Sequence, residues 1–158
     1  FLKIKANYYQ KKPAFDKLTN EVIAKQIEIK NLQEETRETV FKTRAIVNES
    51  TTLSRLLMLT FLNSMDLHEK LMTSESDYKK LQESFEDSTI LVKIHDFLNI
   101  LSDELTNIGI SLQSSVRARP VNDLEAESRE LNIQYFELRN RTLNPETLEN
   151  FMILRQIM

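Results

Sequence analysis

The sequence predicts an all-α fold, an antiparallel bundle of about six helical segments with no strand. Three observations support this prediction. The 158 residues include only one glycine and three prolines, so the residues that punctuate strand-rich folds are scarce. An apolar run occupies residues 53–62, and helical spacing repeats from residue 91 onward. A chain of this length can bury one full hydrophobic core, so we expect a single helical-bundle domain over residues 1–158.

The N-terminal end is basic and aromatic. Residues 1–30 hold seven lysines against three acidic residues. Residues 1–9 could form the tail of a helix, which the following lysines and Pro13 would stop. Lysine beside tyrosine is common where a protein meets a membrane, although an ordinary amphipathic first turn would show the same pattern. The residues of this candidate membrane-proximal end are Lys3, Lys5, Tyr8, Tyr9, Lys11 and Lys12.

A long helix is expected next, with Asp16 as its N-cap and an end near Val47. Polar residues interrupt its apolar stripe, and its other face is rich in glutamate, lysine and arginine. This pattern is typical of a half-exposed bundle helix. Residues 48–50 predict a short turn, after which Ser50 or Thr51 could cap the next helix.

The helix predicted over about residues 51–72 is the one around which we expect the bundle to form. Most of residues 53–62 are apolar, and Arg55 carries the only charge among them. A helix that is apolar on nearly every side must be covered on nearly every side. A membrane span is excluded because four charged residues interrupt the run. These are Arg55, Asp66, Glu69 and Lys70.

A break over residues 73–76 separates this helix from the next. Ser74 and Asp77 have the three-residue spacing of a capping box, which predicts a new helical segment there. Tyr78, Leu81 and Phe85 would form its inner face.

A heptad pattern predicts a helix over about residues 88–118. Its apolar residues recur at alternating steps of three and four, the spacing of a helix–helix seam. A dimerising coiled coil would show the same pattern, whereas Phe97 and Ile100 widen the stripe and favour burial within the chain. Gly109 could mark a close helix crossing. The candidate seam consists of Leu91, Ile94, Leu98, Leu101, Leu105, Ile108 and Leu112.

Two further helices complete the prediction. Pro120 ends the heptad helix, and Asn122 or Asp123 can cap the segment that follows. Asn144, Pro145 and Glu146 then provide a cap, a first-turn proline and an early acid in their favoured order. The last helix begins there.

No pattern for catalysis or for a bound cofactor is recognisable. The chain has no cysteine, a net charge of −3 and two histidines. His68-Glu69 begins like the H-E-x-x-H zinc motif, but Met72 occupies the place of the second histidine. Asp66 and Lys70 are spaced as a helical ion pair. We therefore expect a protein that is not an enzyme, with no catalytic residue, cofactor, metal or nucleic-acid partner.

Residues 64–101 resemble the soluble region of the FUSC/YccS family of bacterial inner-membrane proteins, relatives of fusaric acid resistance exporters. The resemblance rests on an aspartate-apolar-histidine-glutamate-basic run, a serine-rich turn with a tyrosine, and a leucine-rich helix after a phenylalanine-containing break. The opening LKIKANYYQ also looks like the family's segment after its first membrane block. The motif residues, whose role the family leaves open, are Asp66, His68, Glu69, Lys70 and Tyr78.

The resemblance implies a domain excised from a larger membrane protein, with transmembrane blocks of the parent chain before residue 1 and after residue 158. It further implies the cytoplasmic face of the bacterial inner membrane and a parent transporter for efflux, for example of aromatic carboxylic acids. The domain would act in assembly, stability or gating, and a homo-oligomer is compatible with this. The alternative is a stand-alone helical scaffold that binds a partner or itself through the Leu91–Leu112 seam.

Overall fold

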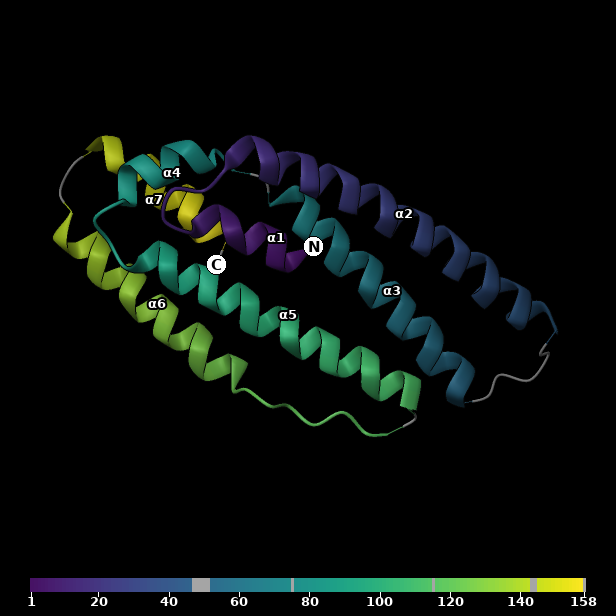
Figure 1. Cartoon of the computed structure of the whole chain (residues 1–158). Helices are drawn as coiled ribbons and strands as arrows, with labels where there is room; N and C mark the ends of the chain where they lie inside the picture. Colours follow the sequence, from purple (N-terminus) through teal and green to yellow (C-terminus); the bar gives the residue numbers. More distant parts are fainter. Residues whose placement is uncertain (47–51, 75, 115, 143–144, 158) are drawn as a thin grey trace. The chain divides into compact units, whose positions relative to one another are not determined.

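Every regular element that the structure describes is helical. The computed structural model describes residues 1–46, 52–74, 76–114, 116–142 and 145–157, and Figure 1 shows the helices in chain order. The predicted all-α class is therefore confirmed. The elements are α1 (Leu2–Ala6), the short 3-10 helix η1 (Asn7–Tyr9), α2 (Phe15–Ile46), α3 (Thr52–Thr73), α4 (Tyr78–Phe85), α5 (Ile90–Ser114), α6 (Leu124–Arg141) and α7 (Pro145–Ile157).

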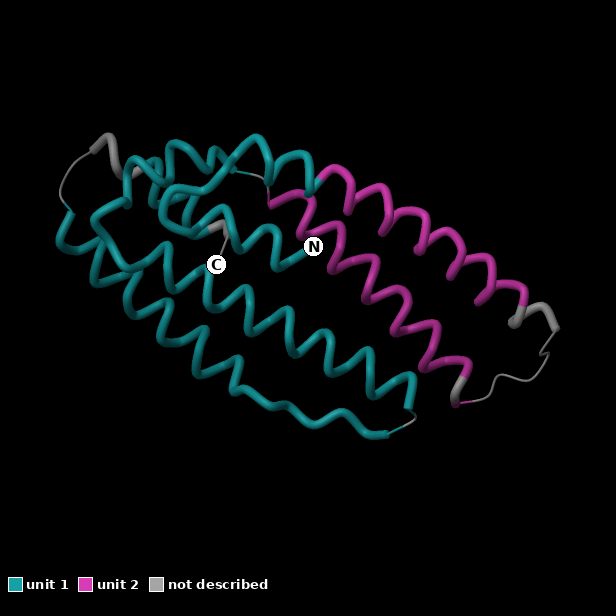
Figure 2. Tube along the Cα trace, viewed as in Figure 1, with its two compact units in different colours: residues 1–22, 76–158 teal, residues 23–75 magenta. Residues whose placement is uncertain are grey.

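The chain divides into two compact units, coloured in Figure 2. Unit 1 contains residues 1–22 and 76–158, and unit 2 contains residues 23–75. Helix α2 begins in unit 1 and continues without a break into unit 2. Unit 1 therefore holds both ends of the chain, and unit 2 is an insertion made of the rest of α2 and all of α3.

Helix α5 organises unit 1, because α1, η1, α4 and α6 all contact it. Helix α7 packs on α4. Apolar side chains from these elements and from the first turns of α2 meet in one core, whose burial supplies the main driving force for folding. Its buried members are Tyr8, Tyr9, Leu18, Val22, Leu81, Phe85, Ile90, Leu91, Ile94, Leu131, Tyr135, Phe151 and Leu154.

Two aspartates begin helices of unit 1 by capping them. The Asp77 side chain accepts a hydrogen bond from the Lys80 backbone N–H at 3.1 Å, and Asp123 accepts one from Ala126 at 3.0 Å. Of the two predicted caps for α6, Asn122 and Asp123, the structure uses Asp123. The predicted capping box is wrong in its details, because Asp77 is itself the N-cap and the Ser74 hydroxyl donates back to the Leu71 carbonyl.

The start of α2 also differs from the expectation by a residue or two. The helix begins at Phe15, so Asp16 lies in its first turn and is not the N-cap. An acid in the first turn still interacts favourably with the helix dipole. The predicted turn over residues 48–50 and the predicted cap at Asn144 lie outside the described residues.

Helix α3 has the predicted extent but not the predicted surroundings. Phe61 is buried at 7% exposure, and the exposed apolar residues of α3 are Leu56, Leu57, Leu59, Leu62 and Met65. The expectation that this helix is covered on nearly every side is therefore wrong. The reason is that, among the described residues of unit 2, the continuation of α2 is the one other helix that can cover α3.

Gly109 does not mark a close helix crossing, which the sequence left as one possibility. A Cβ atom built on Gly109 would meet no atom within 4 Å.

In the part of the chain that the structure describes, no helix combines the length and the apolar character that crossing a membrane requires.

Candidate functional site

The family-like motif is divided between the two units. Asp66, His68, Glu69 and Lys70 lie in the last two turns of α3, in unit 2. His68 is half-buried and the other three are exposed. None of the ion pairs found among the described residues joins Asp66 to Lys70. The predicted pair therefore does not form. The fifth motif residue, Tyr78, begins α4 in unit 1.

Tyr78 packs against the N-terminal tyrosines. Its ring stacks on Tyr8 with 4.2 Å between centroids and meets Tyr9 edge-on at 5.6 Å. Burial of Tyr9, with Tyr78 beside it, raises the pKa of Tyr9 far above its ordinary value, so this phenol stays protonated. The Gln82 amide donates to the carbonyls of Tyr8 and Gln10, each at 2.9 Å. These contacts fix the N-terminal segment onto α4.

The basic N-terminal residues fall into two groups. Lys5 is only 5% exposed, with its ammonium 5.8 Å from the centroid of the Phe1 ring. Lys3 is exposed and pairs with Asp103 of α5 at 2.8 Å. Lys11 and Lys12 are exposed in the turn after η1, where Lys12 adopts a left-handed backbone with φ of 55°. Tyr8, Tyr9 and Lys5 thus belong to the interior of unit 1, and the other three lysines to its surface.

A histidine that the sequence did not single out for this role helps to hold the same segment. His95 Nδ1 lies 3.0 Å from the Ala6 carbonyl oxygen, which can only accept a hydrogen bond. The Asn99 amide nitrogen lies 3.1 Å from His95 Nε2. Nδ1 therefore donates to the Ala6 carbonyl, and this contact ties the N-terminal segment to α5.

The heptad seam of α5 is buried at its first residues and exposed at its last ones. Leu91 and Ile94 are 3% and 2% exposed in the core of unit 1, whereas Ile108 and Leu112 are 44% and 43% exposed. Leu98, Leu101 and Leu105 between them are partly buried. The first half of the seam is consequently a contact within the chain, and only the second half presents an apolar face to solvent.

Glu104 is a buried carboxylate that pattern reasoning missed. One of its oxygens accepts hydrogen bonds from the backbone N–H groups of Val121 and Asn122, at 2.9 and 2.7 Å, and from the Asn122 amide at 2.8 Å. Desolvation raises the pKa of Glu104, but these hydrogen bonds and one from Asn107 outweigh it, so the pKa lies below the ordinary value. Glu104 thereby ties the segment before α6 to α5. In the sequence, the position of Glu104 beside the seam residue Leu105 was the feature that could have indicated its burial.

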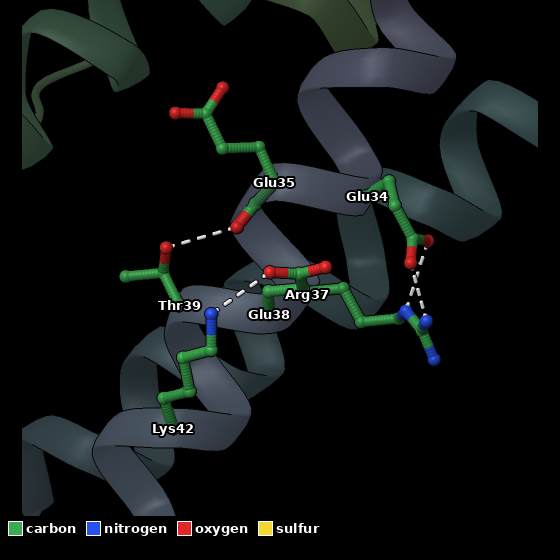
Figure 3. Close-up of polar contacts among 6 residues, drawn as sticks. All are labelled: Glu34, Glu35, Arg37, Glu38, Thr39 and Lys42. Atoms are coloured by element: carbon green, nitrogen blue, oxygen red, sulfur yellow. Dashed lines mark hydrogen bonds and ion pairs between the residues drawn. The ribbon is translucent and has the colours of Figure 1, made fainter.

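The exposed face of α2 in unit 2 carries local ion pairs. Figure 3 shows Arg37 contacting Glu34 through two nitrogens and Lys42 contacting Glu38. The Lys42 ammonium lies 3.0 Å from the Glu38 carboxylate. The hydrogen bond from Arg37 lowers the pKa of Glu34. All these pairs join residues three or four apart on one helix, so they stabilise the helix itself and are typical of a solvated face.

The described residues offer little chemistry for a reaction. Among them no three histidine, cysteine, aspartate or glutamate side chains are grouped to hold a metal ion. A depression of about 280 Å³ in unit 1 lies between residues 83–88 and the end of α6. Its acidic side chains are Glu83, Glu86 and Asp87, and its hydroxyl side chains are Ser84, Ser88 and Thr142. The Ser88 and Thr142 hydroxyls donate to carbonyls of their own chain segments, and the Ser84 hydroxyl accepts from Asn150.

The arrangement of the described residues is therefore one of packing surfaces. The model of the family described as "FUSC-like inner membrane protein yccS" matches residues 1–158. No curated protein and no solved structure matches the chain. Because the match covers every residue, the chain belongs to the FUSC-like family of inner-membrane proteins.

Proposed function

We propose that this chain is the cytoplasmic helical domain of a FUSC-like membrane transporter and that it acts in assembly, stability or gating, not in catalysis. The observation that carries the proposal is the family match over all 158 residues. The parent protein would carry membrane-spanning blocks on both sides of this domain, and its cargo would be small efflux substrates such as aromatic carboxylic acids.

The charge of the N-terminal end supports the cytoplasmic side. Lys3, Lys11 and Lys12 are exposed there, and cytoplasmic segments close to a membrane span carry an excess of lysine and arginine. The packing of Tyr8 and Tyr9 onto α4 would hold these lysines at a fixed place on unit 1.

The alternative, a stand-alone scaffold using the Leu91–Leu112 seam, is less well supported. Leu91 and Ile94 are covered by the chain's own core, so a partner could reach only the second half of the seam. The family match to an inner-membrane protein also favours the membrane-associated reading.

Accessibility of one introduced cysteine tests the proposed side of the membrane. The chain has no cysteine, and the side chain of Val121 is exposed, at 78% for the residue. We expect Val121→Cys, placed in the full-length parent without other cysteines, to react with a membrane-impermeant maleimide in inside-out vesicles but not in intact spheroplasts. The same variant in detergent controls for reactivity. Labelling in intact spheroplasts would overturn the proposal.

A further inference from the structure

One face of α3 carries a short seam that is complementary to itself. Arg55, Leu59, Leu62 and Asp66 follow one another at steps of four, three and four residues, so they lie on one side of the helix. All four are exposed, Leu59 at 57% and Leu62 at 47%. Two leucines thus occupy the middle of this α3 seam, with opposite charges at its two ends.

We propose that the α3 seam binds the α3 seam of a second copy of this chain in antiparallel orientation. A two-fold axis through the midpoint between Thr60 and Phe61 brings each residue opposite the one at equal distance on the other side of that midpoint. Leu59 of one copy then faces Leu62 of the other. Arg55 faces Asp66, and the symmetry forms this pair twice.

The charges also specify the orientation. A parallel pairing in the same register would place Arg55 on Arg55 and Asp66 on Asp66, which is repulsive at both ends. The guanidinium of Arg55 has five N–H donors, so it can bind a carboxylate of the second copy in addition to an acceptor in its own chain. Leu56 and Met65, at 51% and 37% exposure, lie at equal distances from the same midpoint and add apolar surface on the two sides of the seam.

A second copy fits this face better than a lipid surface does. An anionic membrane would repel Asp66 and the neighbouring exposed Glu69, and lipid binding does not call for opposite charges at equal distances from one point. The pairing specifies the assembly role proposed above and rests on it. Its test is made in solution, so its failure is distinguishable from a wrong membrane side in the cysteine-labelling experiment.

The experiment is sedimentation equilibrium of the full 158-residue chain from about 10 µM to about 1 mM, a range suited to a small interface. We expect a monomer–dimer equilibrium. Arg55→Asp and Asp66→Arg should each weaken it by about tenfold or more, because each creates two like-charge contacts. The double variant Arg55→Asp/Asp66→Arg restores opposite charges and should recover dimerisation. Asp96→Arg, at an exposed acid on α5, is the matched control and should have no effect.

A second pair of variants tests the apolar centre. Leu59→Arg should abolish the dimer, whereas Ile110→Arg, at 60% exposure on α5, should leave it intact. Helical circular dichroism establishes that each variant is folded. A monomer throughout the concentration range, or a dimer indifferent to both charge reversals, would overturn the proposal. A monomer that instead co-sediments with phosphatidylglycerol-containing vesicles through Leu59 would identify a lipid surface as the occupant and equally refute self-pairing.

Discussion

At the scale of single residues, Glu104 is the clearest case of a polar group with a defined structural task. A buried carboxylate is costly unless hydrogen bonds satisfy it. Glu104 is 6% exposed and receives three donors from Val121 and Asn122. Charge-assisted hydrogen bonds of this kind are stronger than neutral ones, so the ionised form holds the segment before α6 in place.

We expect Glu104→Gln to lower stability at neutral pH and to lose that effect in acid. The folded-state pKa of Glu104 is depressed, so its contribution is present above the unfolded pKa and disappears as pH falls through the folded pKa. Urea unfolding at about pH 7 and about pH 3 measures this. The two midpoints should differ at about pH 7, and the difference should be smaller at about pH 3. Glu137→Gln, at an exposed glutamate of α6, is the control, and a pH-independent difference would contradict the prediction.

The neighbours of the N-terminal tyrosines could not be predicted from the local sequence. Tyr8 and Tyr9 were predicted to contact either a membrane or their own chain, since both environments favour amphipathic aromatics. Their actual neighbour is Tyr78, about seventy positions further along the sequence. A contact of that sequence separation is set by the fold, so no local pattern could reveal it.

At the scale of elements, α5 shows that the apolar spacing of a helix predicts the helix but not which of its residues are buried. Its alternating spacing correctly predicted a helix, found at Ile90–Ser114. The same spacing gave no information on where the covering elements end. Helices α1 and α6 both contact α5, yet Ile108 and Leu112 remain exposed.

Two isoleucines of this seam form a matched pair for a test. Ile94 is 2% exposed and Ile108 is 44% exposed on the same helix. Ile94→Ala should lower the free energy of unfolding by about 2–5 kcal/mol, because it leaves a cavity in the core. Ile108→Ala should change it by less than about 1 kcal/mol. Denaturant unfolding of both variants measures the two values, and equal losses would show that the second half of the seam is covered in solution.

At the scale of the whole molecule, the sequence predicts the helical class but not the division into two units. The first boundary, between residues 22 and 23, lies inside one continuous helix, so no linker, glycine or proline marks it. The second, between residues 75 and 76, coincides with the break predicted over residues 73–76. Apolar content alone made residues 53–62 look like the centre of the fold. The core instead gathers around α5, because α1, α4 and α6 supply the surfaces that cover it.

This division predicts unequal local stability. The buried core cluster belongs entirely to unit 1, and Phe61 is the one side chain of unit 2 that is buried among those described. Segments with few buried apolar contacts open at lower free energy than the core. We therefore expect amides of α4 and of the first half of α5 to exchange with deuterium at least about tenfold more slowly than amides of α3. Hydrogen–deuterium exchange read by mass spectrometry, corrected for intrinsic rates, measures this at low protein concentration. Equal protection in α3 at that concentration would contradict this prediction, because it would mean that unit 2 is as stable as the core around α5.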